Sequence, residues 1–101
     1  MQATQIGETL ISGGGQFRSF IASGANSTTV KSGKGRICRI SITTPGTGVL
    51  TIFDNTSASG NILYNTVASQ AVGVYDIQLP AEVGLTVQNT ASGPVAVISF
   101  N

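Results

Sequence analysis

The amino-acid sequence predicts an all-β fold, namely a single antiparallel β-sandwich of about eight short strands, jelly-roll-like, with an extended N-terminal arm. Three observations lead to this prediction. Apolar and polar residues alternate with a period of two in segment after segment, and clusters of Gly, Pro, Asn and Ser interrupt them about every eight to twelve residues. No amphipathic helical stretch of useful length is found. A chain of 101 residues also has the size of one domain.

The first residues stand apart from the remainder, so we expect a flexible N-terminal arm over residues 1–15 and a β-sandwich domain over residues 16–101. The arm carries Ile6, Leu10 and Ile11 and ends in "SGGGQ", whose glycines give the backbone great freedom. Two fates are open. The arm orders on assembly by adding a strand to an exposed edge of a neighbouring subunit, or it packs on its own domain.

The turn residues divide the remainder of the chain into strands. The tripeptide Ala-Ser-Gly begins at positions 22, 58 and 91 and precedes an extended segment each time, while "TTPGTG" (43–48) contains the Pro-Gly pair of a tight turn. We interpret the tripeptide as repeated turn usage and not as a structural repeat. The expected strands are residues 16–22, 28–31, 36–43, 48–53, 61–66, 72–79, 84–88 and 95–100. Their order in the sheets is open between a jelly roll and an immunoglobulin-like sandwich.

Two strands show their faces most clearly. The segment "RICRISIT" (36–43) places Cys38, Ile40 and Ile42 on one face, which we expect to enter the core, and Ile37 with Arg39 on the other. Residues 95–100 carry bulk on both faces, so we expect this strand to be covered on both sides, on one of them by another subunit. Its two faces are Val95, Val97 and Ser99 on one side and Ala96, Ile98 and Phe100 on the other.

The stretch "TIFDNTSASGNILYNT" (51–66) is a candidate binding loop, because an acidic residue, asparagines and small hydroxyls lie between two apolar segments. Asp54 and Asn55 have side chains that cap turns and tolerate unusual backbone angles. No base, metal ligand or aromatic platform elsewhere in the sequence points to this stretch. We therefore interpret it as a loop that connects two strands at the rim of the sandwich.

The chemistry of the side chains argues against catalysis. The chain has no histidine, which is the commonest general base at neutral pH, and Cys38 is its single cysteine. A catalytic pair of carboxylates is formally open to Asp54, Asp76 and Glu82, but each has a simpler role in a turn, strand or loop. "KSGKGR" (31–36) lacks the pattern of a phosphate-binding loop. We predict no enzyme activity, no catalytic residue, no metal, no cofactor and no small-molecule substrate.

Charge is scarce and unevenly distributed. Charged residues make up 9% of the chain and the net charge is +1, which argues against nucleic acid and membrane as partners. All five basic residues lie in the first 40 positions, whereas three of the four acids follow. This asymmetry either orients subunits against an acidic surface or reflects chance among nine charges. A surface so poor in charge suits a chain covered by partners, and we expect a homo-oligomer.

The segments "TVKSGKGRICRISITTPGTGVLTIFDNTSASGNILYNT", "GVYDIQL" and "GLTVQNTASGPVAVISF" together resemble small structural proteins of tailed bacteriophages. The resemblance covers about Thr29 to Phe100. It implies a β-sandwich that decorates or cements a capsid, or that forms part of a tail, fibre or head-associated appendage. The implied partner is the major capsid protein or another virion protein, and the implied location is the virion, assembled in the host cytoplasm.

Composition and resemblance together predict a virion structural protein, a capsid decoration or cement module that bridges and stabilises neighbouring coat subunits. The alternative is a receptor- or carbohydrate-binding module of a phage tail or fibre that uses Tyr64, Tyr75 and the Asn-rich loop. The residues that we expect at partner interfaces are Ile6, Leu10, Ile11, Lys31, Lys34, Arg36, Arg39 and Phe100.

Overall fold

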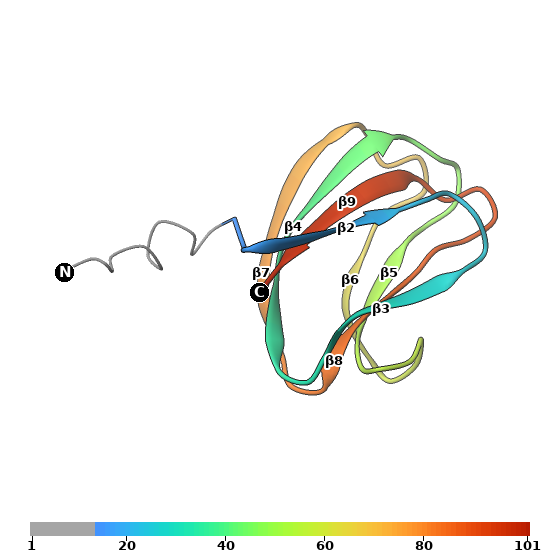
Figure 1. The fold of residues 1–101 in the computed structure, drawn as a ribbon. Coiled ribbons are helices and arrows are strands. Elements are labelled where there is room, and N and C mark those ends of the chain that lie inside the picture. The colour runs from blue at the N-terminus through green and yellow to red at the C-terminus, as the bar shows by residue number, and fades with distance from the viewer. Residues whose placement is uncertain (1–13) are drawn as a thin grey trace.

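A computed structural model of the chain describes residues 14–101, and the secondary structure in that range consists of β-strands (Figure 1). The expected arm falls almost wholly on residues 1–13, which lie outside the described residues. The strands are β2 (Phe17–Ile21), β3 (Ser27–Ser32), β4 (Gly35–Thr44), β5 (Thr51–Asp54), β6 (Asn61–Asn65), β7 (Gly73–Ala81), β8 (Gly84–Gln88) and β9 (Val95–Phe100).

The strands form two antiparallel sheets that lie in two layers (Figure 1). The first sheet has the order β2-β9-β4-β7, and the second has the order β3-β8-β5-β6. The chain passes from one sheet to the other at every connection except the one between β5 and β6. The expected all-β sandwich of about eight short strands is confirmed, and each expected strand corresponds to an observed one.

The core fills the space between the two sheets with branched aliphatic side chains. Ile40 and Ile98 come from the middle strands of the first sheet, and Ile52 and Leu85 come from the middle strands of the second; none of the four is accessible to solvent. Burying one such side chain contributes about 1.5–3 kcal/mol. The two strands whose faces are clearest in the sequence, β4 and β9, therefore supply the half of this centre that comes from the first sheet.

A β-bulge changes the expected faces of β4. Ile37 and Arg39 pair with consecutive residues of β9, so Cys38 is an extra residue between them. Ile37 consequently joins the core, while the Cys38 Sγ lies 3.8 Å from Nδ2 of Asn101 and 4.0 Å from the carbonyl oxygen of Arg36. The expected burial of Cys38 is confirmed, but its assignment to the face of Ile40 was wrong, because a bulge shifts the alternation by one residue.

The loop between β8 and β9 is held by the buried side chain of Asn89. Its Nδ2 donates hydrogen bonds to the carbonyl oxygens of Ala22 (2.8 Å) and Pro94 (2.9 Å), and its Oδ1 accepts one from the amide of Thr90 (2.9 Å). One side chain thus links this loop to the segment that follows β2.

The same loop packs closely against the turn that follows β4. The amide of Gly48 donates a hydrogen bond to the carbonyl oxygen of Ser92 (2.9 Å). A Cβ on Gly46 would overlap this oxygen, and a Cβ on Gly93 would overlap Oδ1 of Asn89. Both glycines are therefore required by the close approach of two backbones, and the loops that carry the chain between the sheets form one interlocked end of the sandwich.

We predict that Asn89→Ala lowers the free energy of unfolding by about 2–4 kcal/mol, because it leaves two carbonyl oxygens without their donor in a buried environment. Urea unfolding at neutral pH measures this. Asn65→Ala is the matched control: this exposed asparagine accepts one hydrogen bond, from the Thr51 hydroxyl, and its loss is expected to cost less than about 1 kcal/mol. Equal losses in the two variants would contradict the role given to Asn89.

Candidate functional site

The outer face of the first sheet, which points away from the core, carries two rows of side chains that run across all four strands. The register aligns Phe20 of β2, Val97 of β9, Ser41 of β4 and Val74 of β7 in one row, which we call the apolar row. Two residues further along the strands lies the charged row, formed by Arg18, Ser99, Arg39 and Asp76 in the same strand order.

The apolar row exposes large hydrophobic side chains on a sheet that is otherwise well ordered. Phe20 is 71% exposed and Val74 is 64% exposed, and Val97 between them is half-buried. The Arg18 guanidinium lies over the Phe20 ring at 5.4 Å from its centroid, which covers one side of the ring with a cation. Apolar side chains that gather in this way on a surface indicate a place where another molecule binds.

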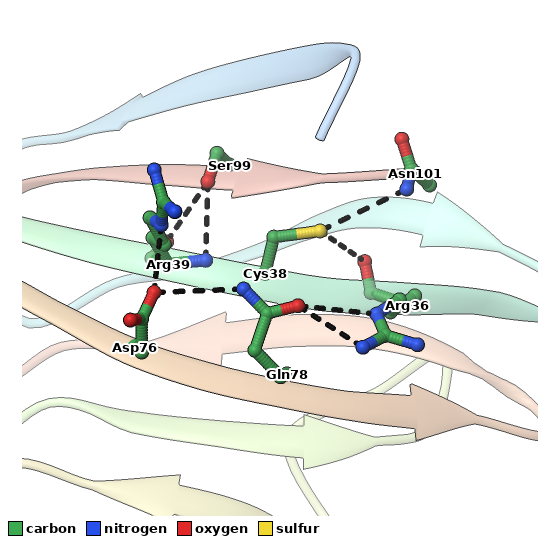
Figure 2. Close-up of polar contacts among 7 residues, drawn as sticks. All are labelled: Arg36, Cys38, Arg39, Asp76, Gln78, Ser99 and Asn101. Carbon is green, nitrogen blue, oxygen red and sulfur yellow. Dashed lines mark hydrogen bonds and ion pairs between the residues drawn. The ribbon is translucent and has the colours of Figure 1, made fainter. Parts of the chain in front are cut away.

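Hydrogen bonds connect the charged row to its neighbours on β4 and β7 (Figure 2). Nε of Arg39 donates to Oδ1 of Asp76 at 2.6 Å, and Nε2 of Gln78 lies 3.5 Å from the same oxygen. Oε1 of Gln78 in turn accepts from Nε (3.3 Å) and Nη2 (3.0 Å) of Arg36. The side chains therefore form a continuous polar chain along the border of the two strands.

The hydrogen bond from Arg39, followed by the one from Gln78, lowers the pKa of Asp76 below its usual value. The carboxylate is consequently charged at neutral pH. Both members of the Arg39–Asp76 pair are substantially exposed, so the pair orients the two side chains more than it stabilises the fold. The outer face thus presents ordered charges beside an apolar row.

The uneven distribution of charge along the sequence is used within the domain. Arg39 and Asp76 come from its basic and acidic parts and pair across β4 and β7. Nζ of Lys34 similarly lies 3.9 Å from Oε1 of Glu82, with both side chains highly exposed. Two of the three acids that follow position 40 therefore meet bases that precede it. Ion pairs within the domain therefore account for the asymmetry of charge without a partner protein.

The expected interface residues lie in different places. Arg36 and Arg39 lie on β4 and belong to the polar chain of the outer face, whereas Lys31 and Lys34 lie on β3 and in the turn that follows it. Phe100 is only 8% exposed and belongs to the core, with its ring centroid 5.8 Å from that of Phe17. Ile6, Leu10 and Ile11 lie outside the described residues.

The first residues that the structure describes, Gly14 and Gly15, lie next to Arg39 of the charged row and next to Cys38. Gly15 has a φ of +78°, and a Cβ there would lie 2.9 Å from the carbonyl oxygen of Phe100 and 3.1 Å from Sγ of Cys38. A Cβ on Gly14 would lie 3.8 Å from Nη1 of Arg39. Gly15 thus covers the Cys38 thiol and brings the start of the described chain next to Arg39.

Asp54, at the end of β5, holds the turn between β7 and β8. Its Oδ1 accepts hydrogen bonds from the amides of Val83 (2.8 Å), Glu82 (3.0 Å) and Gly84 (3.3 Å). The bond from Val83, then that from Glu82, lowers the pKa of Asp54, against a smaller opposing effect of burial. Asp54 therefore caps a turn that is distant in the sequence.

The loop that follows Asp54 lies against β3 and β8. The carbonyl oxygen of Asn55 accepts from the Thr86 hydroxyl at 2.8 Å, and that of Thr56 accepts from the Thr29 hydroxyl at 3.1 Å. Oδ1 of Asn55 accepts the amide of Thr56, which closes the local turn. The polar side chains of this loop are engaged in structural bonds, in agreement with its interpretation as a connection.

The two tyrosines pack against the core and are half-buried. The Tyr75 hydroxyl donates to the carbonyl oxygen of Ala71 at 2.7 Å. Burial, with a smaller effect from Tyr75, raises the pKa of Tyr64. Both rings therefore contribute to the packing of the fold.

The sequence did not single out Phe20, Val74 or Arg18 as interface residues. One signal was present in "FRSFI", where Phe17 and Phe20 are three residues apart and therefore fall on opposite faces of any strand. One of the two rings must consequently point away from the core. The signal for Val74 was its spacing of two from Asp76, which places both side chains on the same face of the strand, opposite Tyr75.

Within residues 14–101, no three side chains of the His, Cys, Asp or Glu type gather as a group that could hold a metal ion. The same residues contain no helix with the length and apolar character needed to span a membrane.

Comparison of the chain with protein-family models, curated proteins and solved structures finds no match. The candidate site of the described residues is the outer face of the first sheet, because the apolar row exposes Phe20 and Val74 there.

We predict that the stability of the protein falls in acid partly through Asp54. Because its pKa in the folded protein lies below the usual 3.8, its contribution is fully present above that pH and is lost as the pH falls through the folded pKa. Urea unfolding at a series of pH values should show a steeper loss for the natural chain than for Asp54→Asn. Parallel curves would contradict this role. At neutral pH we expect the variant to be less stable by about 1–2 kcal/mol.

Proposed function

We propose that this chain is a non-enzymatic virion structural protein, a capsid decoration or cement module that bridges and stabilises neighbouring coat subunits. The observation that carries the proposal is the apolar row, which crosses the outer face of the first sheet and exposes Phe20 and Val74 on its two edge strands, in a domain with few charges. Such a face is suited to protein association. The resemblance of the sequence to tailed-phage structural proteins directs the proposal to a virion.

We further propose that the sandwich is a jelly roll. Its proposed neighbour in the virion is the major capsid protein or another virion protein. The strand orders β2-β9-β4-β7 and β3-β8-β5-β6 support the jelly roll, because the eight strands form two sheets of four and the chain changes sheet at every connection except the one between β5 and β6. An immunoglobulin-like sandwich would place its first two strands in one sheet, whereas β2 and β3 belong to different sheets.

The mechanism of cementing follows from many weak contacts. A stable protein interface buries roughly 800 Å² on each partner, and several copies on a symmetric shell add avidity to contacts that are individually weak. No chemical step is required for this role.

We predict that the purified protein binds capsids assembled without it and raises their resistance to heat. Val74→Ser should weaken this binding at least about fivefold, because it removes apolar surface from the outer face. Val67→Ser is the matched control: Val67 is the same residue type with the same exposure of 64%, but it lies in the loop between β6 and β7. Cosedimentation with capsids measures binding, and capsid melting measures heat resistance.

Failure of the natural chain to cosediment with capsids, or bound capsids that melt no later than bare ones, would overturn the proposal. Equal weakening by Val74→Ser and Val67→Ser would overturn the assignment of the outer face to assembly. Urea unfolding of both variants identifies any loss that arises from the fold.

We also propose that the N-terminal arm takes part in assembly through Ile6, Leu10 and Ile11. The described chain begins beside Arg39, so the arm joins the domain at the outer face. Deletion of residues 1–13 is expected to weaken capsid binding severalfold, and to leave urea unfolding of the domain unchanged within about 0.5 kcal/mol, since the core described for residues 14–101 lies outside the deletion. Capsid binding equal to that of the full chain would contradict this role.

A further inference from the structure

We infer that the outer face of the first sheet pairs with the same face of a second copy of this chain, about a two-fold axis that runs parallel to the strands. The inference rests on the assembly role proposed above and names a second copy as the partner of this face, so that a pair of copies contacts the shell through its remaining surfaces and the pairing contributes avidity to capsid binding. The order of the side chains in the apolar row and in the charged row determines which strands of the two copies can face each other.

If the charged row is laid against a second copy of itself in the opposite strand order, its end charges meet charges of opposite sign. Across β2, β9, β4 and β7 it reads positive, neutral, positive, negative, with Arg18 at one end and Asp76 at the other. A two-fold axis parallel to the strands places β2 of one copy opposite β7 of the other. Arg18 then faces Asp76 of the second copy, and Arg39 faces Ser99 of the second copy. Each interface contains two such pairs of opposite charge, and like charges do not face one another.

The apolar row is matched by the same operation. Phe20 faces Val74 of the second copy, and Val97 faces Ser41 of the second copy, so that a large side chain lies opposite a smaller one at each step. Phe20 and Val74 are the two most exposed members of the row, at 71% and 64%. Pairing would therefore remove from water the apolar surface that the single domain leaves exposed.

An axis perpendicular to the strands, along the apolar row, does not give this match. It would set Phe20 against its own counterpart and would place the charged row of each copy opposite the end of the face that carries Val95 and Thr43. Arg18 and Arg39 would lose water without gaining an opposite charge, which is unfavourable. The order of residues in the rows therefore selects the axis parallel to the strands.

Asp76 is placed to receive a second cation. Arg39 and Gln78 both approach its Oδ1, and its side chain remains 66% exposed. The Arg18 guanidinium lies over Phe20 at the opposite edge of the sheet, where it can project toward a partner. Both members of the proposed contact between copies are therefore accessible in the single domain.

The size of the face sets the expected strength of the dimer. Four strands spaced about 4.8 Å apart span roughly 19 Å, which with strands of this length gives on the order of 500 Å² on each copy. This lies at the low end for a specific interface, so we expect a dissociation constant in the micromolar range. Added salt should weaken the dimer, because the charged contacts lie at its rim.

Two charge reversals test the pairing in solution, without capsids. Arg18→Asp alone sets two acids opposite each other, and Asp76→Arg alone sets two bases opposite each other, so each variant should dimerise at least tenfold more weakly than the natural chain. In an equimolar mixture of the two variants every contact between unlike copies joins opposite charges. The mixture should therefore form a heterodimer at least tenfold tighter than either variant with itself. Sedimentation velocity over a range of concentrations measures all three.

Lys34→Asp is the control, because it makes the same change of charge in the turn after β3, away from the outer face. It should dimerise like the natural chain. The pairing is overturned if the natural chain is monomeric at every concentration, if it forms a trimer or larger ring, or if the mixture associates no more tightly than its components. Because a loss of fold would not be repaired by mixing, the heterodimer separates interface effects from folding effects. Capsid binding is measured separately, so the proposed function can stand if the dimer fails.

Discussion

Each strand of a two-layer sandwich can bury only one of its faces in the shared core, and the other properties of this domain follow from that constraint. In β9 the inward positions are filled by Ala96, Ile98 and Phe100, which leaves Val95 and Val97 on the outside. The neighbouring strands of the first sheet add Phe20 and Val74 at the level of Val97. The described part of this chain thus buries one apolar surface between its two sheets and leaves a second apolar surface exposed on the first sheet.

The sequence was sufficient to predict the strands, because alternation and turn residues are local signals. The pattern of the last strand shows bulk on both faces, so it did not identify the core face of that strand. The face of Cys38 was not evident either, because a bulge depends on how β4 meets β9 and has no residue type that requires it. The order of the strands was open for the same reason, since pairing between segments distant in the sequence leaves no local pattern.

The candidate site was predictable only in part. Arg36 and Arg39 were expected at an interface and lie on the outer face, but the importance of Phe20 and Asp76 depends on register. Register brings Arg39 beside Asp76, although 37 positions separate them in the chain. Phe100 was expected at an interface from the bulk on both sides of its strand, and the structure places it in the core while its neighbours on the other face supply the exposed surface.

The bulge at Cys38 has a chemical consequence. The single thiol of the chain points out of the core, and the Gly15 backbone covers it so completely that none of the residue is accessible to solvent. The amide of Gln16 secures this cover by donating to the carbonyl oxygen of Phe100 and to Oδ1 of Asn101. A thiol reagent should therefore label Cys38 only after a local opening that moves Gly15 or Asn101 away from the thiol. The rate of labelling therefore reports the local opening of the sheet edge around Cys38. No cysteine has to be introduced for this measurement, because Cys38 belongs to the natural chain.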